Sequence, residues 1–413
     1  MTLETMGQNA KAAACQLLTA GSLKNAALKA IAAFLLENSQ TIINANNIDI
    51  ENGKKAGLTV SLLDRLALSG QRIEEMAEGV LQVSKLPDPI GNILYGGVTD
   101  IGLSISKVRV PLGVIGIIYE ARPNVTSDAA ALCLKAGNAV ILRGGKEAIN
   151  SNKAIADIMR DAIESAGLDR NCIQLIEDIS RESAKELMEM TEYLDVLIPR
   201  GGAGLIQTVV QNAKVPVIET GVGNCHVFVD ESADINMAAD IIYNAKTSRP
   251  SVCNAIETIL IHKNISKESL PKIKEKLDEK NVVLRGCGRT IEILGNDVIL
   301  ASEEDYFTEF LDYILAVKVV DSLDDAVSHI AKYSSHHSEC IVTQSYESAE
   351  RFTQAVDSAA VYVNASTRFT DGGQFGLGAE IGISTQKLHA RGPMGLNELT
   401  SFKFVIRGTG QVR

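Results

Sequence analysis

The feature that most constrains the fold is a change of sequence pattern after Pro111. Beyond this residue, short apolar runs alternate with amphipathic segments that are long enough to form helices. Buried parallel strands have continuous apolar sequences, and helical crossovers connect them. The pattern therefore predicts βαβ units and a mostly parallel sheet. The first group of expected strands comprises residues 114–118, 139–142, 173–176, 196–198, 215–218 and 227–229, and the second comprises 255–261, 313–320, 340–342 and 361–363.

The segments that flank this region have other patterns. Residues before about Val83 are rich in alanine and carry apolar side chains at helical spacing, so we expect helices there. Prolines and glycines between residues 87 and 97 mark a break. Residues 98–110 and 398–407 alternate partly between apolar and polar side chains, which predicts strands. A C-terminal strand left alone would expose an edge, so we expect it to pair.

Composition excludes several classes of protein. The 413 residues carry a formal net charge of −11 without a basic block, so nucleic acid and anionic membranes are not expected partners. No apolar run approaches the roughly 20 residues of a membrane span, and the first residues do not resemble a signal peptide. The seven cysteines are odd in number and form no CxxC pair, so we expect neither a disulfide framework nor a zinc site. A cytoplasmic protein of two to three domains is predicted.

Cys253 is the candidate nucleophile. It precedes the apolar run 259–261, and Glu219 ends an apolar strand 253 − 219 = 34 residues earlier. A thiolate can form a covalent acyl intermediate, but a free thiol has a pKa of about 8.5 that its surroundings must lower. A cysteine taken alone is more often a buried structural residue; Glu219, Pro250 and Asn254 favour the catalytic reading. The Glu–Cys pairing resembles the aldehyde dehydrogenase superfamily, in which the matching glutamate activates water.

A glycine-rich turn after the expected strand 139–142 is a candidate phosphate site. Glycines let backbone N–H groups approach a phosphate, and cations add charge, although a plain strand-to-helix turn is the alternative. In the superfamily this loop holds the adenosine ribose, where an acidic residue commonly receives the 2′-hydroxyl of NAD. Lys146 stands at that place, which favours NADP(H). The candidate cofactor residues of this turn are Arg143, Gly144, Gly145 and Lys146.

Further candidates also follow from the superfamily resemblance. A second turn, with Arg200, Gly201 and Gly202, corresponds to its pyrophosphate-side loop, although the turn alone is a weak signal. Glu309 corresponds to its cofactor-ribose glutamate, with a solvated side chain as the alternative.

The oxyanion donor is left open by the sequence. Residues 111–125 resemble the first nucleotide-binding strand of the superfamily, whose members carry an asparagine at the next turn. Here Arg122 stands at that point and Asn124 follows two residues on, so both are candidates. Arg122 would also suit an anionic phosphate.

The most specific segment is 326–341, which contains His329, His336 and His337. No carboxylate array accompanies these histidines, so we expect a structural or substrate-side role and no metal site. This segment resembles the gamma-glutamyl phosphate reductase family, also called glutamate-5-semialdehyde dehydrogenases. The resemblance spans nearly the whole chain and extends to residues 119–128, 248–258, 364–371, 375–385 and 389–393.

The resemblance implies an activity and a mechanism. NADPH would reduce L-glutamyl 5-phosphate to glutamate 5-semialdehyde and phosphate through a Cys253 thioester, the second step of proline biosynthesis from glutamate. Water would hydrolyse the thioester, so we expect Glu219 to support geometry or cofactor rather than to activate water. Arg368 and Arg391 are candidate partners of the substrate carboxylate. The alternatives are an NAD(P)-linked aldehyde dehydrogenase acting on another small aldehyde and a nucleotide-binding relative without catalysis.

The implied architecture is an α/β, aldehyde-dehydrogenase-like fold in three parts. Residues 1–97 and 111–221 would form a Rossmann-like NADP(H)-binding domain, and 222–396 an α/β catalytic domain. A small β element, 98–110 with 397–413, would join copies into a homodimer or homotetramer. Glutamate 5-kinase, which makes the labile substrate, is a candidate partner.

Overall fold

The computed structural model describes residues 2–120 and 122–413, apart from the Ser61 side chain, and divides into two compact units. The first unit comprises Met1–Thr220, Gly376–Gly382 and Met394–Arg413, and the second comprises Gly221–Phe375 and Ile383–Pro393. The passage from the first unit to the second lies next to the expected boundary at 221/222. Two later segments return to the first unit, whereas the expected catalytic domain ran without interruption to residue 396.

Helices dominate the start of the first unit, as the apolar spacing predicts. They are α1 (Leu3–Leu17), α2 (Leu23–Glu37), α3 (Ser39–Lys55), α4 (Val60–Leu66) and α5 (Gly70–Lys85). Helix α2 buries Leu28, Ile31 and Leu35 on one face. Asp49 on α3 accepts hydrogen bonds from the backbone N–H groups of Asn150 and Ser151, at 3.2 and 2.8 Å. This carboxylate thus satisfies otherwise unpaired donors at the start of a later helix.

A four-stranded parallel sheet in the order β5-β4-β3-β6 forms the centre of the first unit. Its strands are β3 (Val114–Tyr119), β4 (Ala139–Arg143), β5 (Ile173–Leu175) and β6 (Val196–Arg200), and its helices are α6 (Asn124–Lys135), α7 (Ile149–Ser165), α8 (Arg181–Glu189) and α9 (Ala203–Asn212). Every residue of β3 is buried, which explains its continuous apolar sequence. The expected strand 215–218 is reduced to one bridge, Val217 with Leu197. Pro216 has no N–H to donate to a longer ladder.

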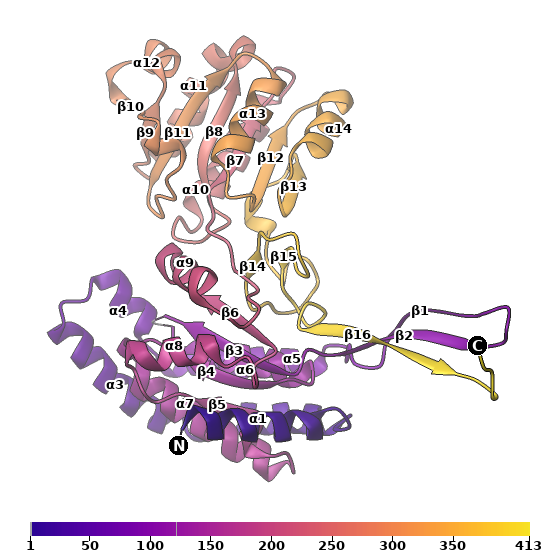
Figure 1. Ribbon diagram of the computed structural model, residues 1–413. Helices are drawn as coiled ribbons and strands as arrows, with labels where there is room; N and C mark the ends of the chain where they lie inside the picture. Colours follow the sequence, from indigo (N-terminus) through magenta and orange to yellow (C-terminus); the bar gives the residue numbers. More distant parts are fainter. Residues whose placement is uncertain (1, 121) are drawn as a thin grey trace. The chain divides into compact units, whose positions relative to one another are not determined.

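The last part of the first unit is a three-stranded antiparallel sheet in the order β1-β2-β16. It joins β1 (Ile93–Val98), β2 (Ser104–Pro111) and β16 (Thr400–Arg407), which run away from the rest of this unit (Figure 1). The expected pairing of the C-terminal strand is confirmed, because β16 pairs with β2 along its length. The sheet begins earlier than residue 98, since Gly96 and Gly97 pair with Ser106 and Ile105 instead of forming a break.

The second unit contains a seven-stranded parallel sheet in the order β10-β9-β11-β8-β7-β12-β13. Its strands are β7 (Cys225–Val229), β8 (Ile256–His262), β9 (Val283–Gly286), β10 (Ile299–Leu300), β11 (Ile314–Val320), β12 (Ser338–Val342) and β13 (Ala360–Val363). Two short strands, β14 (Ile383–Ser384) and β15 (Gly392–Pro393), form a separate antiparallel pair.

Helices cover both faces of the seven-stranded sheet (Figure 1). They are α10 (Ile235–Thr247), α11 (Lys263–Asp278), α12 (Gly288–Leu294), α13 (Leu323–Tyr333) and α14 (Tyr346–Ala355). Side chains of α10 and α11 pack in one core with β7, β8 and β11, and those of α13 and α14 pack in another. The predicted α/β fold with parallel sheets is confirmed. Within the described residues, no helix is both long and apolar enough to cross a membrane.

Candidate active site

Cys253 lies in the turn between α10 and β8. It is half-buried, whereas Cys225 and Cys340 of the same unit are fully buried. The alternative of a sealed structural cysteine therefore does not describe Cys253. A half-buried sulfur on a loop can meet a substrate and is still partly shielded from water.

Residues at the start of β7 and just before it contact the backbone of this turn. A Cβ atom built on Gly223 would lie 1.7 Å from the Cys253 carbonyl oxygen, so no side chain fits at residue 223. The Cys225 thiol donates a hydrogen bond to the same carbonyl, at 3.2 Å. The Gly223 N–H donates to Glu309 Oε1 at 2.7 Å, and burial raises the pKa of Glu309. Glu309, the expected ribose ligand, is thus hydrogen-bonded to Gly223, the residue that packs against the Cys253 carbonyl.

Arg368 lies beside the same turn. Its Nε donates to Ser248 Oγ at 2.9 Å and its Nη1 donates to Asn254 Oδ1. Burial lowers the pKa of Arg368, and the charge of Cys253 is the largest effect that opposes the lowering. A guanidinium close to a sulfur favours the thiolate, which is the reactive form.

Asn254 is held on three sides. Its Nδ2 donates to the carbonyl of Thr370 at 3.0 Å and to that of Arg368 at 3.3 Å, while its own carbonyl accepts from Thr367 Oγ1 at 2.7 Å. The residue after Cys253 is therefore fixed to the loop that carries Arg368.

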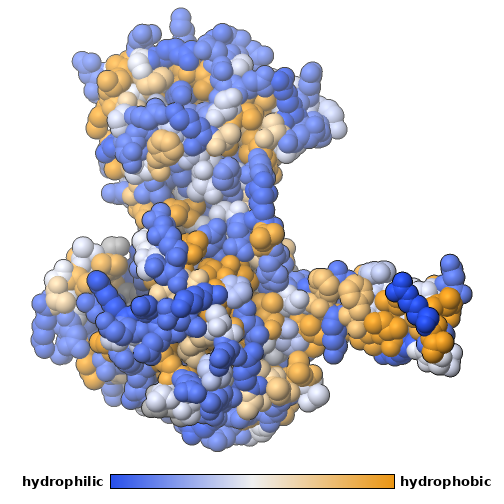
Figure 2. Space-filling model, viewed as in Figure 1, coloured by the Kyte–Doolittle hydropathy of each residue, from blue (hydrophilic) through white to orange (hydrophobic). Residues whose placement is uncertain are grey.

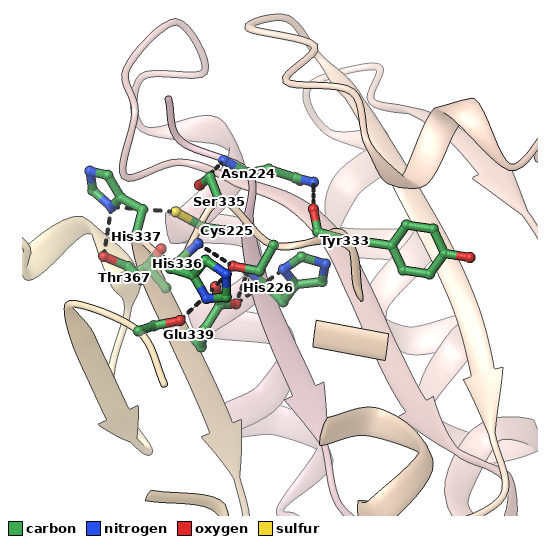
Figure 3. Close-up of polar contacts among 12 residues, drawn as sticks. Asn224, Cys225, His226, Tyr333, Ser335, His336, His337, Glu339 and Thr367 are labelled. Atoms are coloured by element: carbon green, nitrogen blue, oxygen red, sulfur yellow. Dashed lines mark hydrogen bonds and ion pairs between the residues drawn. The ribbon is translucent and has the colours of Figure 1, made fainter. Parts of the chain in front are cut away.

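Residues of the histidine-rich segment contact residues 224–226, where β7 begins (Figure 3). The Asn224 N–H donates to Ser335 Oγ at 2.9 Å, and its Nδ2 donates to the Tyr333 carbonyl at 2.7 Å. Glu339 accepts from the His226 N–H at 2.8 Å. His337 Nδ1 lies 3.7 Å from the Cys225 sulfur, and burial lowers the pKa of His337 to about 4. The segment thus fixes the residues 224–226 that support the Cys253 turn.

Those histidines do not assemble a metal site. Among the described residues, no group of three or more His, Cys, Asp or Glu side chains is arranged to hold a metal ion. His329 instead packs against Tyr306 and Tyr333, and burial lowers its pKa to about 2.

A fully buried ion pair lies under the same turn, between the helix and the strand that flank it. Lys246 Nζ on α10 is 2.6 Å from Glu257 Oε2 on β8, and the Leu311 N–H donates to Glu257 Oε1 at 3.2 Å. Burial raises the pKa of Glu257 to about 7, which the charge of Lys246 partly offsets. Our sequence reasoning missed this pair. The signal was a carboxylate inside the apolar run 255–261.

The first candidate cofactor turn follows β4. Arg143 ends β4, and Lys146 is exposed at the start of a 3-10 turn, Lys146–Ala148. A Cβ on Gly144 would lie 2.1 Å from Asn152 Nδ2, so this glycine is required by packing against α7. Arg143 is engaged by the chain itself, because its Nη2 donates to the carbonyls of Ile179 and Ser180 at 3.2 and 2.9 Å. Lys146 is the exposed cation of this turn.

The second cofactor turn carries a carboxylate that the sequence did not suggest. Arg200 ends β6, and Gly201 and Gly202 lead into α9. The Gly202 N–H donates to Glu120 Oε2 at 2.8 Å. A carboxylate at a helix N-terminus occupies the kind of position that also attracts a phosphate.

The candidate oxyanion donors lie at the start of α6. Arg122 is exposed, and Asn124 Nδ2 donates to Asp128 Oδ2 at 2.9 Å. Burial raises the pKa of Asp128 to about 6, although hydrogen bonds from Asn124 and Ser127 and the charge of Arg200 lower it. The Asn124 amide thus has a partner within its own helix, and the donor's identity stays a prediction.

Two remaining candidates complete the predicted set. Glu219 is half-buried and lies two residues beyond the isolated bridge at Val217, so it does not end a regular strand as the sequence predicts. Arg391 donates from Nη1 to Asp357 Oδ1 at 2.7 Å, and Lys387 pairs with the same carboxylate. These two cations lower the pKa of Asp357 to about 2. Arg391 therefore serves a surface ion pair in this structure.

The family model described as "Aldehyde dehydrogenase family" matches residues 6–284 of this chain, a range that contains Cys253, the whole four-stranded parallel sheet, and strands β7 and β8 of the seven-stranded sheet. A curated gamma-glutamyl phosphate reductase from Heliobacterium modesticaldum is 60% identical over 412 residues, covering 100% of this chain and 99% of the relative. The crystal structure of gamma-glutamyl phosphate reductase from Thermotoga maritima is 51% identical, with a TM-score of 0.98 and coverage of 100% of this chain and 99% of that chain.

A more distant solved structure shares the fold alone. It is an acetylating aldehyde dehydrogenase from Geobacillus thermoglucosidasius, 19% identical, with a TM-score of 0.69 over 99% of this chain and 97% of that chain. The chain therefore belongs to the aldehyde dehydrogenase family and, by its full-length likeness, to the branch of the gamma-glutamyl phosphate reductases. The resemblance seen in the sequence is thereby confirmed.

Proposed function

We propose that this chain uses NADPH to reduce L-glutamyl 5-phosphate to L-glutamate 5-semialdehyde and phosphate, the second step of proline biosynthesis from glutamate. The observation that carries the proposal is the half-buried Cys253 thiol beside the Arg368 guanidinium. Relatives that are 60% identical over the full length, and are named gamma-glutamyl phosphate reductase, supply the substrate class.

The chemistry begins with attack of the Cys253 thiolate on the acyl carbon of the substrate. A sulfur–carbon bond forms, and the bond from carbon to the phosphate oxygen breaks, so that phosphate leaves with the electron pair. NADPH, when bound, supplies hydride to the thioester carbonyl. Collapse of the resulting hemithioacetal releases the aldehyde and restores the thiolate.

Glu219 has no water to activate in this direction. Phosphate is a good leaving group and needs no base to expel it, whereas water would destroy the thioester. Glu219→Gln is therefore expected to keep most of the reductive turnover, while Cys253→Ala loses at least about a thousandfold. An equal loss in both variants would contradict the supporting role of Glu219.

The preference for NADPH over NADH rests on Lys146. An exposed ammonium attracts the 2′-phosphate that distinguishes the two cofactors. Lys146 also stands at the place where NAD enzymes of the superfamily commonly carry an acidic side chain, which would repel this phosphate.

The test is oxidation of the semialdehyde, which runs the reaction backwards. The purified chain should reduce NADP⁺ only when inorganic phosphate is added, because phosphate must cleave the thioester. Turnover with NAD⁺ in the absence of phosphate would favour the second candidate, an aldehyde dehydrogenase that acts on another small aldehyde. A coupled assay with glutamate, ATP, glutamate 5-kinase and NADPH checks the forward direction and the candidate partner together.

A further inference from the structure

The guanidinium of Arg368 is held in a set orientation beside Cys253. It is hydrogen-bonded to residues on either side of the cysteine in the sequence: Nε donates to Ser248 Oγ at 2.9 Å, and Nη1 donates to Asn254 Oδ1. The planar fork of an arginine held in this way presents its remaining N–H groups without a further loss of side-chain freedom.

A second guanidinium, that of Arg249, lies close enough to Arg368 to affect its pKa. Arg249 follows Ser248, is exposed, and lowers the pKa of Arg368 through repulsion between like charges. The carboxylate that acts on Arg368 in the opposite direction is Asp371, whose Oδ1 also accepts from the N–H groups of Gly373 and Gln374 at 2.9 and 3.2 Å. Arg249 and Arg368 thus bring two positive charges near one another, and the Asp371 carboxylate that acts on Arg368 also holds two backbone N–H groups.

We propose that Arg249 and Arg368 form the subsite that binds the phosphoryl group of the acyl phosphate and holds the phosphate as it leaves. This inference rests on the proposed function and names the residues that recognise the reacting end of its substrate. The dianion of a phosphate is the ligand that suits two guanidinium groups, because each can donate parallel N–H···O bonds.

The place of Arg368 beside the Cys253 turn indicates which end of the substrate this arginine binds, the phosphate or the α-carboxylate. Cys253 attacks the carbon that bears the phosphate, whereas the α-carboxylate of the substrate lies at the other end of the glutamyl chain. Arg368 is bonded to Asn254, the residue after Cys253, so its guanidinium lies at the end of the substrate that carries the phosphate and not at the end that carries the α-carboxylate. As the carbon–oxygen bond breaks, negative charge grows on the leaving phosphate, and both arginines stabilise it.

The experiment measures semialdehyde oxidation at varied concentrations of inorganic phosphate in Arg249→Gln, Arg368→Gln and Arg368→Lys. The KM for phosphate should rise about tenfold to a hundredfold in each Gln variant, as expected for loss of a charge-assisted contact. The KM for the semialdehyde should stay within about threefold of the wild type. Arg368→Lys should restore part of the phosphate affinity. Arg351→Gln, which removes an exposed cation paired with Asp324 on α14, is the matched control and should change neither constant.

A second readout does not depend on turnover. Inorganic phosphate should slow the alkylation of Cys253 by iodoacetamide, a neutral reagent, in the wild type but not in Arg249→Gln. If Arg368→Gln is too unstable to assay, this comparison alone decides. Unchanged protection by phosphate in Arg249→Gln would overturn the subsite.

The outcomes also separate this inference from the proposed function. Wild-type oxidation that needs no phosphate would refute the proposed function itself. Wild-type oxidation that requires phosphate, with an unaltered KM for phosphate in both Gln variants, would refute only the subsite. Slower alkylation of Arg368→Gln with normal phosphate affinity would reduce Arg368 to a stabiliser of the thiolate, and this result too would overturn the proposal.

Discussion

At Gly223 the lack of a side chain decides where Cys253 can lie. A Cβ atom there would meet the Cys253 carbonyl at 1.7 Å, and a backbone atom cannot move aside as a flexible side chain would. We expect Gly223→Ala to lower the free energy of unfolding by about 1–3 kcal/mol and to displace the nucleophile. Thermal unfolding and the rate of Cys253 alkylation measure the two effects. Gly288→Ala is the control, because a Cβ at Gly288 meets nothing within 4 Å; equal effects of both changes would contradict the argument.

Asp128 should give the first unit a pH-dependent stability. Burial raises its pKa to about 6 from an ordinary value of 3.8, so the folded chain holds this proton more tightly than the unfolded chain. The free energy of unfolding contributed by Asp128 therefore falls as the pH rises from about 4 to about 6. Asp128→Asn cannot ionise and should lose this dependence. Urea unfolding of both proteins at pH 4.5 and pH 7 is the measurement, and the variant should gain relative to the wild type at the higher pH.

The predictable part of the candidate site was the part that carries a motif. Cys253 was found from its spacing to Glu219, and Glu309 and Arg368 were named from the resemblance to known families. Gly223 was missed, because it acts by leaving space for the Cys253 carbonyl, and only the folded structure shows that space. The contact of Arg368 with Asn254, beside Cys253, likewise appears only in the structure, because 114 residues separate the two in the sequence.

At the scale of elements, the spacing of apolar residues and the position of apolar runs predicted most of the helices and strands. Strand β8 is shifted by one residue from the expected run 255–261, and β4 extends one residue beyond the expected run 139–142. Strands β9 and β10 were not anticipated, because β10 has two residues and β9 begins with an exposed valine. The expected strand at 215–218 was overestimated, because an apolar run does not show that Pro216 interrupts the ladder.

The link between α10 and β8 yields a prediction about the buried ion pair. Glu257→Gln would leave the Lys246 ammonium without its counter-charge in a fully buried position, which should cost about 3–5 kcal/mol of unfolding free energy. The double change Lys246→Met with Glu257→Leu removes both charges and should recover most of that loss. Denaturant unfolding of the single and double variants is the measurement. A double variant as unstable as the single one would show that the pair is needed for more than charge balance.

At the scale of the whole molecule, the three-stranded sheet β1-β2-β16 is the part best suited to pairing with another chain. Strands β1 and β16 are its two edges, and each has an unpaired side. Their large apolar residues are exposed, among them Val98 at 74% and Ile406 at 54%, and Figure 2 shows hydrophobic surface along this sheet. Exposed edges and apolar side chains on the same element are features of an interface between chains.

We therefore expect a homodimer, or a tetramer built from dimers, in which this sheet pairs with a neighbouring chain. Side chains alternate along a strand, so Phe404 and Ile406 share one face of β16 while Lys403 lies on the other. Changing Phe404 and Ile406 together to Glu places two charges in the expected interface and should produce monomers at low micromolar concentration. Lys403→Gln is the matched control and should leave the assembly intact. Light scattering coupled to size-exclusion chromatography gives the mass of each, and a monomeric wild type would refute the expectation, because the exposed side chains of β16 would then have no partner to cover them.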